Sequence, residues 1–124
     1  MLTLTDRGDV MPLVERNVRE CGLEGRVKTQ ELDWDTPATF DATGVDLVLG
    51  ADVVYHVDGH AGLAATLSHL CSPATQVLLA YRPRSVDDGA FFENVGTNFD
   101  ISQLSAKPTP IPWERGGPAV EMDK

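Results

Sequence analysis

Apolar residues recur along this chain at two spacings, one typical of strands and one typical of helices. Short β-prone or continuous aliphatic runs predict strands at 2–5, 26–32, 45–49, 76–81, 99–104 and 120–122. Apolar residues three or four apart predict helices at 9–21, 59–71 and 90–95. Segments rich in proline, glycine or charge predict loops at 36–44, 82–89 and 107–118. Strands and helices therefore alternate over most of the chain.

This order predicts an α/β fold with a doubly wound, mostly parallel sheet, because helical segments separate successive strands. The aliphatic run at 45–49 does not alternate, which favours a strand covered on both faces. The last two strands lack an intervening helix, so an antiparallel hairpin is expected at one edge of the sheet. In the first helix, Asp9 is suited to cap the start, Pro12 to occupy the first turn and Gly22 to end the helix.

Residues 45–56, V-D-L-V-L-G-A-D-V-V-Y-H, carry the most chemical content. The predicted strand is followed by two small residues, Gly50 and Ala51, then by Asp52 and Tyr55. Ligands of open parallel sheets bind beyond the carboxyl ends of the strands, where small residues admit a ligand and an acid and a phenol can serve chemistry. The alternative is that these residues merely end a strand and cap the next helix.

Chain length and net charge limit the possible domain number and partners of this protein. A chain of 124 residues is one domain at most and can bury a core. A net charge of -9 argues against nucleic-acid and anionic-membrane partners, both of which need clustered Lys and Arg. The charge permits a basic protein substrate, although a contribution to solubility alone is the commoner case.

The positions of the cysteines indicate the cellular compartment of the protein, and those of the histidines indicate whether it can bind a metal ion. Cys21 and Cys71 fit no metal spacing and lie on apolar helix faces, which predicts buried thiols in a reducing compartment. His56 and His60 are four residues apart, but no third ligand is apparent, so no metal site is expected. No signal peptide or transmembrane run is visible, which predicts a cytoplasmic location, with the nucleus as the alternative. The protein is expected to be a monomer.

Six short motifs in chain order resemble a known group. They are T-L-T-D at 3–6, E-R-N-V at 15–18, L-D-W at 32–34, L-V-L-G-A-D-V-V-Y at 47–55, L-L-A-Y-R-P-R at 78–84 and F-F at 91–92. The chain resembles the seven-β-strand (class I) S-adenosylmethionine-dependent protein lysine methyltransferases, in the methyltransferase-like group with a D-x-x-Y motif. The resemblance implies a Rossmann-like sheet, S-adenosyl-L-methionine as cofactor and a lysine side chain of a protein as substrate.

For the cofactor, the resemblance implies that Asp6 accepts hydrogen bonds from the ribose hydroxyls, since a carboxylate can accept from both hydroxyls of a vicinal diol. Trp34 would contact the adenine and Asp33 its exocyclic amine, while Gly50 and Ala51 would run along the methionine part. The structural alternatives are that Asp6 caps the following helix and that Trp34 covers a sheet edge.

For the substrate, the resemblance places Asp52 and Tyr55, the D-x-x-Y pair, at the entry of the target lysine. A carboxylate can bind and orient the incoming ammonium, and a tyrosine ring can contact it by a cation–π interaction. Asp52 or water can take the proton that the lysine loses before methyl transfer.

The family's acid-x-Gly-x-Gly loop, which follows its first strand, has no counterpart in this sequence. Met1 coincides with the start of the family's second strand, so residues 1–124 are expected to be the carboxyl-terminal portion of one class I domain, without the first strand and glycine-rich loop. Weak or absent cofactor binding and two unpaired strand edges are expected for this chain alone. The alternatives are a non-catalytic interaction module with this fold and a nicotinamide-dependent oxidoreductase.

Overall fold

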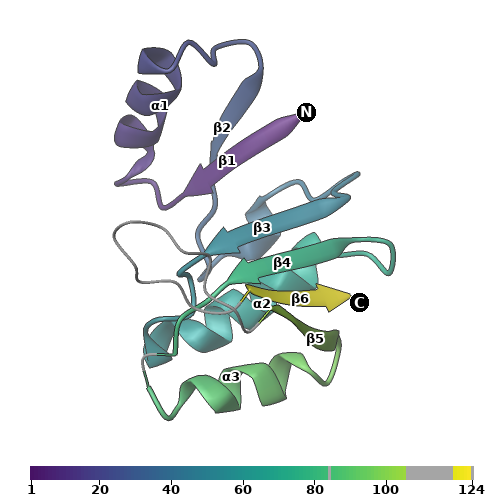
Figure 1. The fold of residues 1–124 in the computed structure, drawn as a ribbon. Coiled ribbons are helices and arrows are strands. Elements are labelled where there is room, and N and C mark those ends of the chain that lie inside the picture. The colour runs from purple at the N-terminus through teal and green to yellow at the C-terminus, as the bar shows by residue number, and fades with distance from the viewer. Residues whose placement is uncertain (84, 106–118, 124) are drawn as a thin grey trace. The chain divides into compact units, whose positions relative to one another are not determined.

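The computed structural model describes residues 1–83, 85–105 and 119–123. The chain divides into two compact units, Met1–Asp41 and Ala42–Lys124, and each is described by itself (Figure 1). The single domain expected from the sequence stays a prediction, and the loop expected at 107–118 lies outside the described residues. No helix of the described residues is long and apolar enough to cross a membrane.

The first unit is a strand–helix–strand arrangement. Strand β1 (Leu2–Asp6), helix α1 (Met11–Glu20) and strand β2 (Val27–Glu31) follow one another, and a 3₁₀ turn, η1 (Pro37–Thr39), comes later. Strands β1 and β2 are parallel, with Leu2 opposite Val27 and Asp6 opposite Glu31. The parallel pairing requires a crossover, which α1 supplies. The elements predicted at 2–5, 9–21 and 26–32 are therefore confirmed, with boundaries that shift by one or two residues.

Helix α1 begins differently from the prediction and ends as predicted. Val10 occupies the N-cap position and makes no side-chain cap, so the prediction that Asp9 caps the helix is wrong. The Asp9 carboxylate instead pairs with the Arg7 guanidinium at 2.9 Å. At the other end, Gly22 adopts a φ of 64°, and its N–H donates to the carbonyl of Arg19 at 3.0 Å. A left-handed glycine of this kind satisfies the last helical carbonyls.

The second unit contains a four-stranded sheet and two helices. Its elements are β3 (Leu47–Ala51), η2 (Val57–Gly59), α2 (His60–Leu70), β4 (Gln76–Ala80), α3 (Asp88–Val95), β5 (Asp100–Ser105) and β6 (Ala119–Asp123). The strand order is β3-β4-β6-β5, in which β3 and β4 are parallel and β6 is antiparallel to both of its neighbours. The predicted antiparallel hairpin is confirmed, and β5 rather than β6 lies at the edge. Of the four described strand pairs, two are parallel and two antiparallel.

Helices α2 and α3 contact each other, and the burial pattern of β4 shows that one face of this strand is covered. Val77 and Leu79 of β4 are 0% and 1% exposed, whereas the alternate residues Gln76 and Ala80 are exposed. The residues that the helices bury are Leu63, Thr66, Leu67, Leu70, Asp88, Phe91 and Val95. Burial alternates along β4 because successive side chains of a strand point to opposite faces of the sheet.

Strand β3 is less enclosed than its sequence predicts. Leu47 and Leu49 are 48% and 64% exposed, so the expectation of a strand covered on both faces is wrong for the described residues. The two helices of its own unit can cover only one face, and the leucines lie on alternate positions. Within the described residues β1 pairs with β2 and β3 pairs with β4, which leaves each of β1 and β3 with one unpaired edge. Each such edge presents unpaired backbone groups.

The two cysteines have different surroundings. Both are free thiols; Cys71 is buried at 5% exposure, as predicted, but Cys21 is exposed. Cys21 is the C-cap residue of α1, beyond the last turn that packs on the strands. The prediction of a buried thiol at Cys21 is therefore wrong. The last buried residue of α1 is Val18, and Cys21 lies beyond the end of the helix.

Candidate functional site

The first candidate group lies at the carboxyl end of β1. Asp6 is the last residue of the strand and is exposed, and its Oδ1 accepts a hydrogen bond from the N–H of Arg7 at 2.8 Å. The N-cap of α1 is Val10, so the alternative that Asp6 caps this helix is wrong. The Asp6 carboxylate is thus presented to solvent at the strand end, where parallel sheets bind ligands.

The residues after β2 lie at the same edge of the two-stranded sheet. The N–H of Leu32, a residue 7% exposed, donates to the carbonyl of Asp6 at 2.9 Å and extends the ladder beyond β2. Asp33 then forms a turn, in which its Oδ1 accepts from the N–H of Asp35 at 2.9 Å. Trp34, within that turn, is half-buried. The structure therefore brings Asp6, Asp33 and Trp34 to adjacent strand ends of the first unit.

Gly50 and Ala51 are the last two residues of β3, whereas the sequence prediction placed them after the strand. The correction follows from pairing, because Gly50 lies opposite Leu79 and Ala51 opposite Ala80 in the parallel ladder. A Cβ at Gly50 would lie 2.7 Å from Cδ2 of Leu79, closer than van der Waals contact allows. Packing against a buried leucine thus disfavours any larger residue at this position, while Ala51 is exposed.

Asp52 has an unusual backbone conformation directly after β3. Its φ is 56°, and it is the one non-glycine residue with a positive φ among the described residues. Its N–H donates to the carbonyl of Ala80 at 2.8 Å, which continues the β3–β4 ladder by one bond. A left-handed backbone costs roughly 1–2 kcal/mol for an ordinary L-residue, and Asp and Asn tolerate it best. Such conformations cluster at functional sites. The Asp52 side chain is exposed.

Tyr55 lies three residues after Asp52 and directly follows the buried Val54. Val54 is 0% exposed, whereas Tyr55 is 57% exposed. The ring of Tyr55 meets the ring of His56 edge to face, with centroids 6.5 Å apart. Val54 therefore fixes the segment to its unit while Asp52 and Tyr55 present an acid and a phenol to solvent at the carboxyl end of β3.

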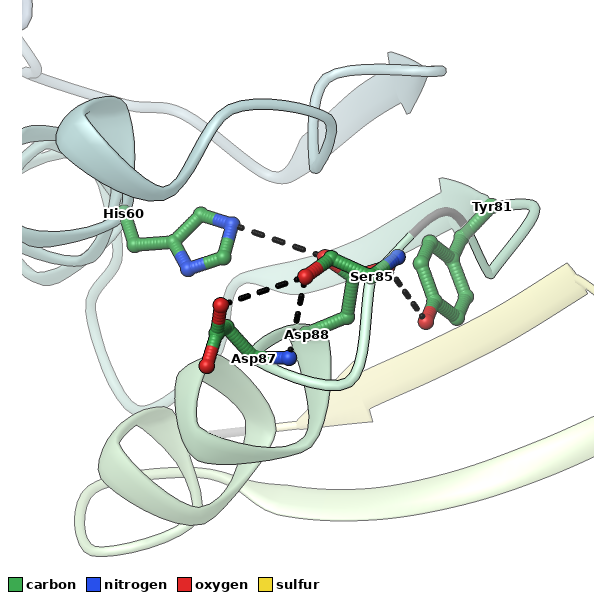
Figure 2. Close-up of polar contacts among 5 residues, drawn as sticks. All are labelled: His60, Tyr81, Ser85, Asp87 and Asp88. Carbon is green, nitrogen blue, oxygen red and sulfur yellow. Dashed lines mark hydrogen bonds and ion pairs between the residues drawn. The ribbon is translucent and has the colours of Figure 1, made fainter.

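A polar cluster that the sequence analysis missed lies beyond the carboxyl end of β4. Figure 2 shows Asp88 between His60 and Tyr81, with Ser85 and Asp87 beside it. Asp88 is 2% exposed, and its Oδ2 accepts from the hydroxyl of Tyr81 at 3.2 Å and from the N–H of Ser85 at 3.1 Å. The sequence prediction assigned 82–89 to a loop and began the helix at 90. It therefore did not place Asp88 in the first turn of α3, where the structure has it. An acid suits that place because of the helix dipole.

The structure shifts the protonation of the Tyr81 hydroxyl. Burial, then the charge of Asp88, then the hydrogen bond to that carboxylate raise the pKa of the Tyr81 hydroxyl above its ordinary value of 10.0. All three causes favour the neutral phenol, which donates its proton to the carboxylate. Tyr81 is therefore a hydrogen-bond donor at neutral pH and fixes the orientation of Asp88.

The histidines do not share a site. His56 is exposed and lies 3.6 Å from Asp58, whereas His60 is the first residue of α2 and its side chain is 12% exposed. In the described part of the chain, no group of three or more His, Cys, Asp or Glu side chains is placed to hold a metal ion. The segment between His56 and His60 is the 3₁₀ turn η2, so the two rings are not on one face of an α-helix.

Sequence comparison identifies relatives with a shared chemistry. The family model described as lysine methyltransferase matches residues 1–98. The protein N-lysine methyltransferase METTL21A of Danio rerio is 35% identical over 107 residues, which cover 83% of this chain and 49% of that protein. The protein-lysine N-methyltransferase EFM6 of Saccharomyces cerevisiae is 33% identical over 113 residues, 82% of this chain and 46% of the relative. The chain thus spans about half the length of these curated relatives.

Solved structures share the fold at lower identity. The S-adenosylmethionine-dependent methyltransferase SibL in its apo form aligns with a TM-score of 0.66 at 21% identity, over 98% of this chain and 42% of that chain. PigF with SAH aligns with a TM-score of 0.67 at 11% identity, over the same shares. These alignments show a Rossmann-like α/β methyltransferase fold. Together with the family model and the relatives, they lead to one conclusion: the chain belongs to the lysine methyltransferase family.

Proposed function

We propose that this protein transfers a methyl group from S-adenosylmethionine to a lysine side chain of a protein substrate, and that the lysine approaches Asp52 and Tyr55. The observation that carries the proposal is the left-handed backbone of Asp52, with a φ of 56° and an exposed carboxylate. A strained residue at the carboxyl end of a parallel strand is expected where a ligand is bound. Membership of the lysine methyltransferase family supports the same chemistry.

The residues of the second unit suit the substrate side of the reaction. When bound, S-adenosylmethionine would supply a methyl group on a sulfonium: a neutral amine would form the N–C bond in line as the C–S bond breaks, and the neutral thioether of S-adenosylhomocysteine would leave. The Asp52 carboxylate binds the incoming ammonium and orients it, and the exposed ring of Tyr55 contacts the cation through its face. The ammonium proton passes to Asp52 or to water, which leaves a neutral nitrogen as the nucleophile. Orientation supplies most of the help that such a displacement needs.

The residues of the first unit suit the cofactor. The exposed Asp6 carboxylate can accept hydrogen bonds from both ribose hydroxyls, and the half-buried indole of Trp34 offers an apolar face to the adenine. Asp33 follows β2 at the same edge and can accept from the exocyclic amine. In the second unit, Gly50 and Ala51 end β3 and would border the methionine part, although packing against Leu79 is sufficient to explain the glycine.

The competing proposal is an interaction module that keeps the fold without transferring methyl groups. Family membership favours methyl transfer over the nicotinamide-dependent alternative. The net charge of -9 is compatible with a basic protein substrate. The cytoplasmic or nuclear location and the monomeric state stay predictions.

Labelled methyl transfer tests the proposal. The purified protein is incubated with S-adenosylmethionine labelled in its methyl group and with cell lysate, beside Asp52→Ala and Asp58→Ala. Asp58 is an exposed carboxylate of the same connection and serves as the matched control. We expect protein labelling that Asp52→Ala lowers by about a hundredfold and that Asp58→Ala changes by less than roughly twofold. Absence of labelling by a wild type that binds S-adenosylmethionine in calorimetry would support the interaction module, and labelling unaffected by Asp52→Ala would remove Asp52 from the site.

A further inference from the structure

Asp88 ties together the loop between β4 and α3. It lies in the first turn of α3 and is 2% exposed, and its Oδ2 accepts from the Tyr81 hydroxyl and the Ser85 N–H at 3.2 and 3.1 Å. Tyr81 directly follows β4, so one carboxylate oxygen joins the beginning and the end of this loop. A buried carboxylate needs such donors, and the helix N-terminus adds favourable electrostatics.

The other oxygen of Asp88 faces the start of α2. Its Oδ1 lies 3.8 Å from Nε2 of His60, whose side chain is 12% exposed. The His60 ring also packs on Phe91, with centroids 5.3 Å apart. Nε2 of His60 is buried and has no hydrogen-bond partner in the described part of the chain. A distance of 3.8 Å is too long for a hydrogen bond, so the imidazole edge faces the carboxylate without one.

The segment with Asp52 and Tyr55 is therefore attached at both ends to the region from Ala80 to Asp88. At its start, the Asp52 N–H donates to the carbonyl of Ala80 at 2.8 Å. At its end, His60 meets Asp88. Ala80 and Asp88 themselves are linked through Tyr81, which follows Ala80 and donates to the Asp88 carboxylate.

We propose that Asp88 is a positioning residue for the lysine-binding segment, acting through His60 and Tyr81; this inference rests on the proposed function of Asp52 and Tyr55. A left-handed aspartate keeps its conformation only when the surrounding structure holds both flanks. Asp88 holds the downstream flank by drawing the first residue of α2 toward the loop after β4. Loss of the carboxylate charge releases the start of α2 and lets residues 52–59 relax toward the extended backbone that most residues prefer.

Amide hydrogen exchange, measured residue by residue with NMR, tests this inference without a need for activity. The variant Asp88→Asn removes the charge and keeps the shape, and Asp87→Asn is the matched control, because Asp87 is the exposed neighbour that accepts from the Ser85 hydroxyl. The reporters are the N–H groups of Asp52 and Gly59, which are hydrogen-bonded in the segment. The reference is the N–H of Gln76, which donates to Asp46 at the opposite end of β4.

We expect Asp88→Asn to accelerate exchange at Asp52 and Gly59 by about tenfold or more, because hydrogen bonds to a charged carboxylate are stronger than those to a neutral amide and oppose local opening. Exchange at Gln76 and exchange in Asp87→Asn should change by less than roughly twofold. Unchanged exchange at Asp52 and Gly59 would overturn the inference. Equal acceleration at Gln76 would overturn it too, because that result means global destabilisation.

A second variant keeps the inference testable if Asp88→Asn does not fold. His60→Phe retains a ring against Phe91 and leaves the bonds of Asp88 to Tyr81 and Ser85 in place. We expect faster exchange at Gly59 with Gln76 unchanged. Exchange at Gly59 that matches the wild type would contradict the link through His60.

Methyl-transfer kinetics of the Asp88→Asn variant test whether the position of the lysine-binding segment affects the reaction. If the wild type labels protein, Asp88→Asn should lower kcat by about tenfold and leave the KM for S-adenosylmethionine within roughly twofold. A rise in that KM with unchanged kcat would refute a role on the lysine side. If the wild type does not label protein, the proposed function fails, while the exchange experiment still decides whether Asp88 holds the segment.

Discussion

The backbone N–H of Asp52 donates to the carbonyl of Ala80 across 2.8 Å, at the point where the β3–β4 ladder ends. This bond holds Asp52 in a left-handed conformation, with a φ of 56°. The strand direction therefore stops at Asp52, and the following residues turn away with Val54 buried and Tyr55 exposed. This backbone bond thus fixes the upstream flank of the residue that carries the proposed chemistry.

Substitutions at Asp52 should separate stability from activity. Asp52→Gly removes the left-handed strain, so we expect the free energy of unfolding to rise by up to about 1 kcal/mol while labelling is lost. Asp52→Ala keeps the strain without the carboxylate and should lower the free energy of unfolding by about 1 kcal/mol. Urea denaturation of the two variants measures both values. A stability of Asp52→Gly below that of Asp52→Ala would show that the conformation is not strained.

Gly50 should tolerate no side chain. A Cβ there would lie 2.7 Å from Cδ2 of Leu79, a residue 1% exposed, so we expect Gly50→Ala to cost about 1–3 kcal/mol through overpacking. Gly89→Ala is the control, because Gly89 lies in α3 and a Cβ there meets nothing within 4 Å. Alanine is the better helix former, so this control should stabilise by roughly 0.5–1 kcal/mol. Thermal or urea unfolding that fails to show opposite signs would contradict the packing account.

The two leucines on adjacent strands should differ in their contribution to stability. Leu79 is 1% exposed and Leu49 is 64% exposed. We expect Leu79→Ala to cost about 2–5 kcal/mol, since it leaves a cavity in the core. Leu49→Ala should cost less than about 1 kcal/mol, since most of its side chain already meets solvent. Similar losses for the two variants in urea unfolding of this 124-residue chain would mean that the exposed face of β3 is covered in solution.

Tyr81 should make stability fall at alkaline pH. Burial and the Asp88 carboxylate raise the pKa of Tyr81 above 10.0, so the folded state favours the neutral phenol relative to the unfolded state. The stabilisation is fully present below the unfolded pKa and is lost as pH rises through the folded pKa. We expect the free energy of unfolding to decline above about pH 10, and to decline less in Tyr81→Phe.

The exposed Tyr55 supplies the comparison for this measurement. Tyr55 is 57% exposed, so Tyr55→Phe is the matched control for the removal of one tyrosine hydroxyl. The measurement is urea unfolding across alkaline pH, together with the tyrosinate absorbance of the folded protein. An alkaline decline in Tyr81→Phe equal to that of the wild type would show that Tyr81 does not couple to folding.

Much of the fold followed from local pattern. The strands and helices occur in the predicted order, because a period of two residues or of 3.6 residues is visible in any short window. The hairpin of β5 and β6 followed from the absence of a helical segment between them. The motif residues Asp6, Asp33, Trp34 and Asp52 lie at strand ends, as their positions in the sequence indicate.

Other features depended on contacts between distant residues. Periodicity shows which side of an element is apolar but not what covers it, so the exposure of Leu47 and Leu49 could not be predicted. Pairing with β4 extended β3 through Gly50 and Ala51, which the sequence placed outside the strand. The cluster around Asp88 joins His60 and Tyr81, residues that no local window contains together.

By itself, the sequence determined the order of the elements and the residue types at the strand ends. These depend on neighbours within one turn or one pleat, where side-chain periodicity and backbone preference act directly. Only the tertiary structure decided the left-handed backbone of Asp52, the crowding at Gly50 and the burial of Asp88 between His60 and Tyr81. Each of these features depends on contacts between two distant parts of the chain. Residues 79–88 contact residues 50–60, and the residues in contact lie more than 20 positions apart in the sequence.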